Sequence, residues 1–400
     1  MLLIKKEYFS SLTYTIINTL VGLMIVRIIY ENFSDVIDQY IIMSTLRQEG
    51  LFSFIGAGLI NGALVYGARE TIKEVNYFLF SRLKIIVVFL IPIVILMHFT
   101  DFNYIYILTI VSIPIGLIRQ YLRNILFTKN SFLKLNLITF IFGVVYVLLI
   151  SVSDSLYDVS LFFLVIVSLE SISLAFQNGI IYDIKEPSKV VQTNIRQNII
   201  QGVASSAFNN VDKIIFAKII PVDILLTIDF AYKIRAISTK VISSITNVWF
   251  SKLHNYKDHL AFEKFMGIAY IFTFSIILFF IDDISEFFKI NNINITLFSI
   301  LVLPSFFLIV LYKMRIMNIK TIKLNIVTNY RLIEGVLKSI IAPILVFFFG
   351  IQFGFIFAFL LSLILLAAGV YYSTKLFKGK SDIFLIILLT TYTICLFFVL

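Results

Sequence analysis

Residues 132–180 read FLKLNLITFIFGVVYVLLISVSDSLYDVSLFFLVIVSLESISLAFQNGI, two long apolar runs separated by a short acidic stretch. Each run has the roughly 20 apolar residues that a helix needs to cross the hydrocarbon core of a bilayer. The stretch between them contains Asp154 and Asp158 and is too short for a soluble domain. The pattern predicts two transmembrane helices, 132–152 and 157–180, joined by a tight turn.

The same pattern extends along the whole chain. Of its 400 residues, 60% are hydrophobic and only 14% are charged, a composition far too apolar for a water-soluble globular domain. Apolar runs predict the spans 8–30, 40–66, 76–99, 103–126, 132–152, 157–180, 196–220, 222–250, 262–281, 293–316, 326–349 and 351–374. The last apolar stretch, 383–400, is either a thirteenth span or an interfacial tail. We therefore predict an all-α integral membrane protein with 12 or 13 transmembrane helices.

The predicted spans fall into two sets of six. We expect an N-lobe at 1–182, a cytoplasmic connector at 183–195, a C-lobe at 196–375 and an extra segment at 376–400. An offset of 188 residues places Asp223 on Asp35 and Arg235 on Arg47. This weak repeat, with an even number of spans in each set, favours two halves related by an axis along the membrane normal, as in alternating-access transporters.

Basic residues indicate how the chain crosses the membrane. Most of the 33 fall in one alternate set of predicted connections, Arg119 and Arg123 among them. The opposite set holds Lys289 as its only basic residue and is rich in acids. Lys and Arg accumulate in cytoplasmic loops, so we expect a cytoplasmic N-terminus. The first apolar run has no clean cleavage site after it and is long enough to span, so we expect it to be retained.

Several classes of chemistry find no support in the composition. The single cysteine, Cys395, excludes a disulfide framework, and the three histidines have no metal-ligand spacing. The net charge of +10 is explained by the topology and does not indicate a nucleic-acid partner. We expect neither a metal nor a cofactor.

Charged residues inside the predicted spans are the main functional signal. A charge near the bilayer centre costs about 2.5 to 3.5 kcal/mol on insertion scales, so it usually faces a wet cavity or a partner. Basic residues outnumber acids there, which favours an anionic substrate. The basic residues are Arg27, Arg47, Lys213, Lys218, Lys233, Arg235, Lys240, Arg331 and Lys338, and the acids are Glu49, Glu170, Asp212, Asp229 and Glu334.

Structural roles compete with binding roles at several of these positions. Arg27 lies near the outer interface, where its side chain can extend into the headgroups. Lys233 follows Asp229 by four residues, so the two form either a local structural pair or part of a cavity. Arg47 and Arg235 are stronger binding candidates because they lie roughly 10 to 20 Å below the outer surface.

The predicted span 196–220 carries a polar stripe. Its polar residues recur every three or four positions and therefore share one helix face: Asn198, Gln201, Ser205, Asn209 and Asp212. Such a stripe lines either a cavity or a helix contact. We favour the cavity, because five polar groups exceed what one contact normally satisfies.

Three segments are similar to those of a known family. They are YFSSLTYTIINTLVGLMIVRII at 8–29, NNVDKIIFAKII at 209–220 and DFAYKIRAISTKVISSITNVWFSKL at 229–253. The chain resembles bacterial polysaccharide flippases of the Wzx type, in the multidrug/oligosaccharidyl-lipid/polysaccharide (MOP) exporter superfamily. The similarity covers most of the chain, through diffuse motifs.

The resemblance implies a V-shaped, MATE-like bundle of two six-helix lobes in the bacterial inner membrane. Its implied function is to move an undecaprenyl-diphosphate-linked oligosaccharide, such as an O-antigen repeat unit, from the cytoplasmic to the periplasmic leaflet. Membrane lipid and polysaccharide polymerase machinery are the other partners it implies. The expected roles are diphosphate binding for Arg47, Arg235, Lys233 and Arg27, glycan contact for Asn198, Gln201, Ser205 and Asn209, and coupling to H⁺, Na⁺ or membrane potential for Asp212, Asp229 and Glu334.

Two other functions stay open. A MATE-type small-molecule exporter would share this architecture, but a cavity that exports cations should be net acidic. A polysaccharide polymerase or ligase would need a large periplasmic loop with reactive groups, and no Ser/His/Asp, metal or Gly-rich phosphate pattern is visible. The sequence therefore predicts a transporter and not an enzyme.

Overall fold

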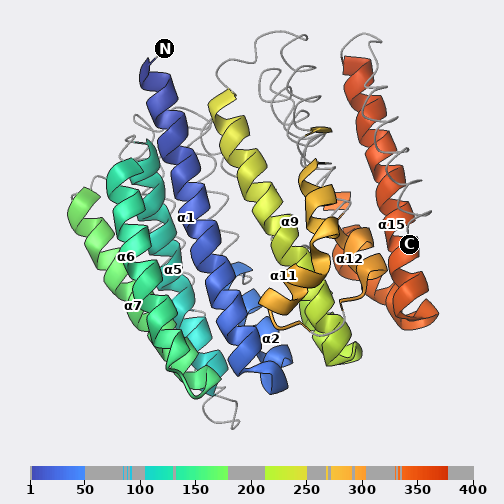
Figure 1. The fold of residues 1–400 in the computed structure, drawn as a ribbon, viewed down its shortest axis with the longest axis horizontal. Coiled ribbons are helices and arrows are strands. Elements are labelled where there is room, and N and C mark those ends of the chain that lie inside the picture. The colour runs from blue at the N-terminus through green and yellow to red at the C-terminus, as the bar shows by residue number, and fades with distance from the viewer. Residues whose placement is uncertain are drawn as a thin grey trace. The chain divides into compact units, whose positions relative to one another are not determined.

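The computed structural model is helical throughout its described elements (Figure 1). It describes residues 2–49, 84, 88, 91, 104–128, 132–178, 212–249, 267–268, 272–290, 293–302, 329, 332–333 and 336–376. The chain divides into two compact units, Met1–Ile214 and Ile215–Leu400, which we describe separately. The predicted connector 183–195, the stretch 383–400 and several predicted spans lie outside the described residues.

The first unit contains five α-helices and one short 3-10 helix within its described ranges. They are α1 (Leu2–Asn32), η1 (Ser34–Val36), α2 (Ile37–Glu49), α5 (Tyr104–Thr128), α6 (Phe132–Ser151) and α7 (Leu156–Asn178). Helices α5, α6 and α7 begin and end within two residues of the predicted spans, so these three spans are confirmed.

The helices of this unit pack as neighbours in a fixed order. Helix α1 packs on α6, α6 on α7, α7 on α5, and α5 on α2. The α1–α6 contact is close because Gly143 has no side chain: a Cβ there would lie 3.0 Å from the methyl groups of Val21. Between α2 and α7, the Ser160 hydroxyl donates a hydrogen bond to the sulfur of the fully buried Met43 at 2.8 Å.

The turn between α6 and α7 is fixed by a capping interaction. The backbone N–H of Asp158 donates to Ser155 Oγ at 3.2 Å, and that hydroxyl donates to the Asp158 carboxylate at 2.7 Å. The pair satisfies a backbone donor that the helix start leaves open, and it places a carboxylate at the positive end of the helix dipole. The short acidic stretch predicted from the sequence is this turn.

The chain bends by 96° between residues Ile16–Asn32 and Ser34–Ser44. Phe33 lies at the bend, is buried, and donates its N–H to the Ile29 carbonyl at 2.9 Å. The segment expected as a loop between the spans 8–30 and 40–66 is therefore mostly helical. Asp35 and Asp38 lie in the first turns of η1 and α2, where carboxylates stabilise a helix start.

One face of α6 exposes large apolar side chains at helical spacing, namely Leu133, Leu137, Phe140, Val144 and Leu148. A patch of this length would be a liability in water and suits contact with lipid. By length and composition, four described helices can cross a membrane, or five if the bent pair is one crossing. The protein is a multi-pass membrane protein. The predicted total of twelve extends beyond the described residues.

The second unit contains α9 (Val222–Trp249), α11 (Ile281–Phe287), α12 (Ile295–Val302), the π-helical η3 (Leu337–Ile341) and α15 (Ala342–Leu376). Helix α12 packs against both α9 and α15. Aromatic rings fill the contact: Phe298 stacks on Phe230 at 5.7 Å and on Phe274 at 6.4 Å between ring centroids. Phe230 also contacts Phe288 at 5.1 Å. These rings are buried and form the core of this unit.

Helix α11 departs from the prediction. The acids Asp282 and Asp283, which directly follow the predicted span 262–281, lie in the first turn of α11. The helix stops where Lys289 adopts a left-handed backbone (φ 55°) and the Ile290 N–H donates to the Ser285 carbonyl at 2.9 Å. Carboxylates near a helix start and a left-handed residue after its end are both typical of helix termini.

Helix α15 is two helical arms rather than one straight helix. Gly350 interrupts it with φ 78° and ψ 171°, a conformation essentially restricted to glycine. In a straight helix, residues eight apart are separated by about 12 Å. Yet the rings of Phe349 and Phe357 lie 5.2 Å apart, and a Cβ on Gly354 would lie 2.5 Å from the Val346 nitrogen. The chain therefore reverses at Gly350, between the predicted spans 326–349 and 351–374.

Burial in the two units follows the predicted offset of 188 residues. Helix α9 begins 188 residues after η1. Ile37 and Leu225 are both buried, and so are Met43 and Ala231 at the same offset. Matching burial in matching elements supports an internal repeat.

Candidate functional site

The structure describes some of the predicted site residues and not others. Arg27 is half-buried near the end of α1, and Asp229, Lys233 and Arg235 all lie on α9. Arg47 lies in the last turn of α2, where only the backbone is described. The remaining candidates, Asn198, Gln201, Ser205, Asn209 and Glu334, lie outside the described residues.

Asp229 and Lys233 form an ion pair along α9. The Lys233 ammonium donates to Asp229 Oδ2, and the side chains are 20% and 2% exposed. The four-residue spacing predicted a possible ion pair between Asp229 and Lys233, and the structure confirms it. Because the lysine charge is compensated, an anion that binds Lys233 must compete with a buried carboxylate.

We expect the two halves of this pair to respond differently to substitution. Lys233→Met should cost about 3 kcal/mol of stability, because it leaves a buried carboxylate without its cation. Asp229→Asn should cost only about 1 kcal/mol, because the partly exposed lysine can turn towards water. The measurement is the thermal midpoint of the purified full-length variants. Equal midpoints for the two variants would contradict this assignment.

Arg235 and Lys233 do not share a face of α9. Two residues along a helix rotate by about 200°, so the half-buried Arg235 points away from Lys233. At the repeat offset, Asp229 takes the position of the fully buried Ile41 in the first unit. The ion pair is therefore a feature of the second unit, whereas the arginines Arg47 and Arg235 occupy equivalent positions in both.

Asp212 has a local structural partner. It is 1% exposed and is the first described residue of the helical stretch 212–219. Its Oδ1 accepts the backbone N–H of Lys213 at 2.9 Å. Its predicted coupling role stays a prediction.

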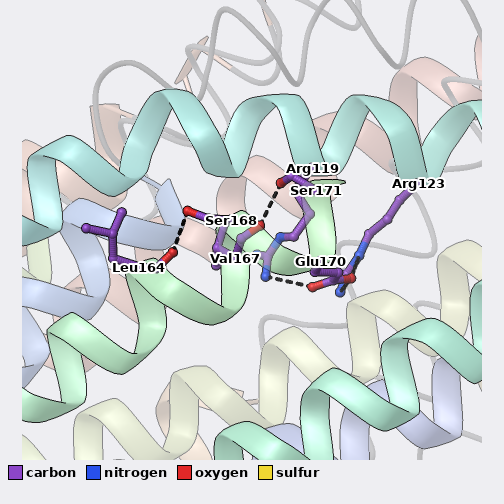
Figure 2. Close-up of polar contacts among 7 residues, drawn as sticks. All are labelled: Arg119, Arg123, Leu164, Val167, Ser168, Glu170 and Ser171. Atoms are coloured by element: carbon purple, nitrogen blue, oxygen red, sulfur yellow. Dashed lines mark hydrogen bonds and ion pairs between the residues drawn. The ribbon is translucent and has the colours of Figure 1, made fainter. Parts of the chain in front are cut away.

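A second ionic cluster, which was not predicted from the sequence, joins α5 to α7 (Figure 2). Glu170 on α7 is buried, and both of its oxygens accept hydrogen bonds from α5. Arg119 Nη1 donates to Oε2 at 3.3 Å, while Arg123 donates to Oε1 through Nε at 2.7 Å and also through Nη2. We call Arg119, Arg123 and Glu170 the α5–α7 cluster.

The fold explains why these three residues meet. Arg119 and Arg123 are four residues apart, so both project from one side of α5. The Arg119 guanidinium also lies 5.7 Å from the centre of the Phe163 ring on α7. Below the cluster, towards the ends of α5 and α7, Leu126, Leu135 and Leu174 form a buried apolar layer.

Arg119 and Arg123 lie within the predicted span 103–126 and were counted with the basic residues of the predicted cytoplasmic side. The structure places both towards the C-terminal end of α5, which continues to Thr128. The signal that could have identified the cluster was Glu170 itself, because an acid within an apolar span requires a cation from another helix. Arg119 and Arg123, on another apolar helix, were the candidates for that cation.

Comparison with known proteins gives the fold. No protein-family model and no curated protein sequence matches this chain. An outward-facing multidrug resistance MATE transporter of the MOP superfamily matches with TM-score 0.60 and 13% identity, over 95% of this chain and 96% of its own. The chain has the MATE fold.

Other structures with the MATE fold agree. An inward-facing MATE transporter matches with TM-score 0.61 and 13% identity, over 94% of this chain and 100% of its own. A MOP superfamily transporter from Pyrococcus furiosus, reported to have a binding pocket of reverse polarity, matches with TM-score 0.60 and 12% identity, over 93% and 94% of the two chains. Outward-facing and inward-facing structures match about equally well, so the likeness identifies a fold and not a conformational state.

Proposed function

We propose that this protein is a flippase for an undecaprenyl-diphosphate-linked oligosaccharide, moving it from the cytoplasmic to the periplasmic leaflet of the bacterial inner membrane. The observation that carries the proposal is the excess of cationic over anionic residues inside the predicted spans. A diphosphate is an anion that Arg and Lys bind well, and a lipid tail can stay in the bilayer while its headgroup crosses.

The MATE fold supports transport as the activity. Solved structures with this fold are transporters, and they include both outward-facing and inward-facing examples. The Pyrococcus furiosus transporter carries a pocket of reverse polarity in the same fold. A fold that tolerates pockets of different polarity is compatible with an anionic substrate in this chain.

The α5–α7 cluster adds to the charge argument. Arg119 and Arg123 lie inside the predicted span 103–126, together with the basic residues already counted within the spans. A small-molecule exporter of cations should instead carry a net acidic interior. The positive balance therefore favours the flippase over that exporter.

The basic residues of the predicted spans bind the diphosphate. Arg47 and Arg235, at equivalent positions of the repeat, contact it directly, and Arg27 is an accessory cation near the outer interface. The stripe of Asn198, Gln201, Ser205 and Asn209 contacts sugar hydroxyls. Glu334 and Asp212 are candidates for coupling to H⁺, Na⁺ or the membrane potential.

Lys233 and Asp229 can link substrate binding to coupling. Because Asp229 is paired with Lys233, a phosphate reaches the ammonium fully only when the carboxylate lets it go. A proton or Na⁺ on Asp229 would release Lys233 for the phosphate. In this proposal Lys233 exchanges the Asp229 carboxylate for the substrate phosphate during the transport cycle, and Asp229 exchanges Lys233 for a proton or Na⁺.

Deletion of the gene tests the proposal directly. Loss of a flippase should cause lipid-linked repeat units to accumulate on the cytoplasmic side and should stop surface polysaccharide formation. The measurement is extraction of lipid-linked oligosaccharide from deletion and parent strains, with leaflet assignment by a membrane-impermeant probe. Accumulation on the periplasmic side would instead indicate a polymerase or ligase, and unchanged levels would reject both.

A further inference from the structure

We propose that the tip of the α15 hairpin is a lipid-contacting surface whose side chains lie among the acyl chains, directly below the headgroups of the bilayer. The hairpin tip consists of the phenylalanines on either side of the reversal at Gly350, namely Phe347, Phe348, Phe349 and Phe353. Its partner is bilayer phospholipid and not another protein. The inference does not depend on the proposed function.

The reversal at Gly350 has no polar loop around it. Residues 339–374 contain no charged side chain, and Gln352 is the only polar side chain within 342–361. The turn between α6 and α7 is different, because it contains Asp154 and Asp158. Polar turn residues favour water, where their hydrogen bonds are satisfied. Apart from Gln352, no side chain near the reversal favours a position in water.

The hairpin tip exposes a dense aromatic surface. Each of its phenylalanines is more than half exposed, and they lie on both arms of the hairpin. Exposed apolar side chains continue along the arms at helical spacing, through Ile344, Leu360 and Ile364. A surface of this length costs free energy in water and is stable in hydrocarbon. The lack of charged residues also disfavours docking of a soluble protein, because such interfaces usually have a polar rim.

The opposite face of the hairpin is already covered by its own unit. Phe355 is buried, and its ring lies 5.2 Å from that of the fully buried Phe216. The two arms also pack directly on each other, since a Cβ on Gly354 would lie 2.4 Å from the Val346 Cα. The exposed face of the tip is therefore separate from the core of the unit, and the close packing of the arms holds its phenylalanines in place.

The contact between Phe216 and Phe355 indicates the depth of the tip. Phe216 precedes Pro221 by five residues. Phe355 follows Gly350 by the same number, so each turn lies about 7.5 Å along a helix from the contact. The predicted topology places both turns on the same side of the membrane, and exposed Asp223 holds the first turn at the polar headgroups. Gly350 therefore lies at a similar level, where headgroups and water satisfy its backbone.

From that level, the phenylalanines of the first arm reach into the acyl chains. Side chains on a helix lean towards its N-terminus, which for Phe347, Phe348 and Phe349 is the direction away from the turn. Phe353, on the second arm, lies within one helical turn of the reversal. The turn backbone and Gln352 thus meet the headgroups, while the aromatic rings contact the acyl chains.

The experiment measures the surroundings of a nitroxide attached to the hairpin tip of the full-length protein in phosphatidylcholine nanodiscs. Cys395, the single cysteine, is replaced by serine, and Phe348→Cys or Phe353→Cys is spin-labelled before reconstitution. Power-saturation EPR compares collisions with oxygen, which concentrates in the acyl chains, and with a water-soluble nickel chelate. The controls are Asp154→Cys in the exposed α6–α7 turn and Phe140→Cys on the exposed apolar face of α6. Monodisperse elution confirms that each labelled variant is folded.

We expect oxygen collisions to exceed nickel collisions severalfold at both tip positions, because the label lies in hydrocarbon. Asp154→Cys should show the opposite ratio, and Phe140→Cys, near the middle of its span, should show the highest ratio of oxygen to nickel collisions. The tip should therefore report a depth between those of the two controls.

Three results would overturn the proposal. Nickel collisions as frequent as at Asp154→Cys would place the tip in water. Low collision rates with both reagents would place it against another protein, such as a second copy of this chain. A depth equal to that of Phe140→Cys would place it far below the headgroups. No transport is measured, so this result and the deletion result are independent.

Discussion

Replacing Glu170 with alanine is expected to destabilise the protein by about 3 kcal/mol, at the lower end of the range for removing one partner of a buried ionic pair. The variant leaves Arg119 and Arg123 facing each other without the carboxylate that binds both. The value is at the lower end because the arginines are about one-fifth exposed and can turn partly towards polar surroundings.

The measurement is the thermal midpoint of the purified protein, followed by size-exclusion chromatography. Glu170→Gln should fall between the parent and Glu170→Ala, because it retains an acceptor and loses the charge. Asp154→Ala is the matched control, since this exposed acid lies in the turn at the other end of α7. Equal midpoints for Glu170→Ala and Asp154→Ala would refute the assigned contribution of the cluster.

A triple variant tests whether the cost of Glu170→Ala comes from the two arginines that lose this carboxylate. Replacing Arg119, Arg123 and Glu170 together with methionine removes every charge of the cluster. Apolar replacement of a buried ionic group is often neutral or stabilising. We expect this variant to regain most of the stability lost in Glu170→Ala, measured as the thermal midpoint of the purified protein.

Arg235→Ala is expected to abolish surface polysaccharide formation in a deletion strain, without abolishing membrane insertion. The expectation rests on the proposed function: Arg235 and Arg47 are cations at equivalent positions of the repeat, and loss of a guanidinium removes a strong contact to phosphate. The same result is expected for Arg47→Ala. The readout is polysaccharide in the complemented strain together with the amount of protein in its membranes.

Lys218→Ala is the control for these arginine variants. Lys218 is exposed and near the predicted outer interface, so its removal should leave complementation intact. Normal polysaccharide in the Arg235 and Arg47 variants would remove both residues from the proposed site. Loss of protein from the membrane would indicate a structural role instead.

Local patterns in the sequence were sufficient for much of the fold. The spans α5, α6 and α7 follow from runs of apolar residues, because the length of a crossing helix is set by the bilayer. The break near Gly350 follows from two such runs meeting there, and the Asp229–Lys233 pair follows from a spacing of four residues. Each of these features depends on residues close together in the chain.

Features that depend on distant residues required the tertiary structure. Glu170 lies 51 and 47 residues from Arg119 and Arg123, and only the packing of α7 against α5 brings them together. The sequence shows charged residues of both signs within the predicted spans but does not indicate which of them pair. Helix periodicity determines the face on which a side chain lies, whereas helix packing determines what that face meets. The apolar runs of the sequence therefore determined where the described spans lie. The fold determined which residues the buried charges pair with.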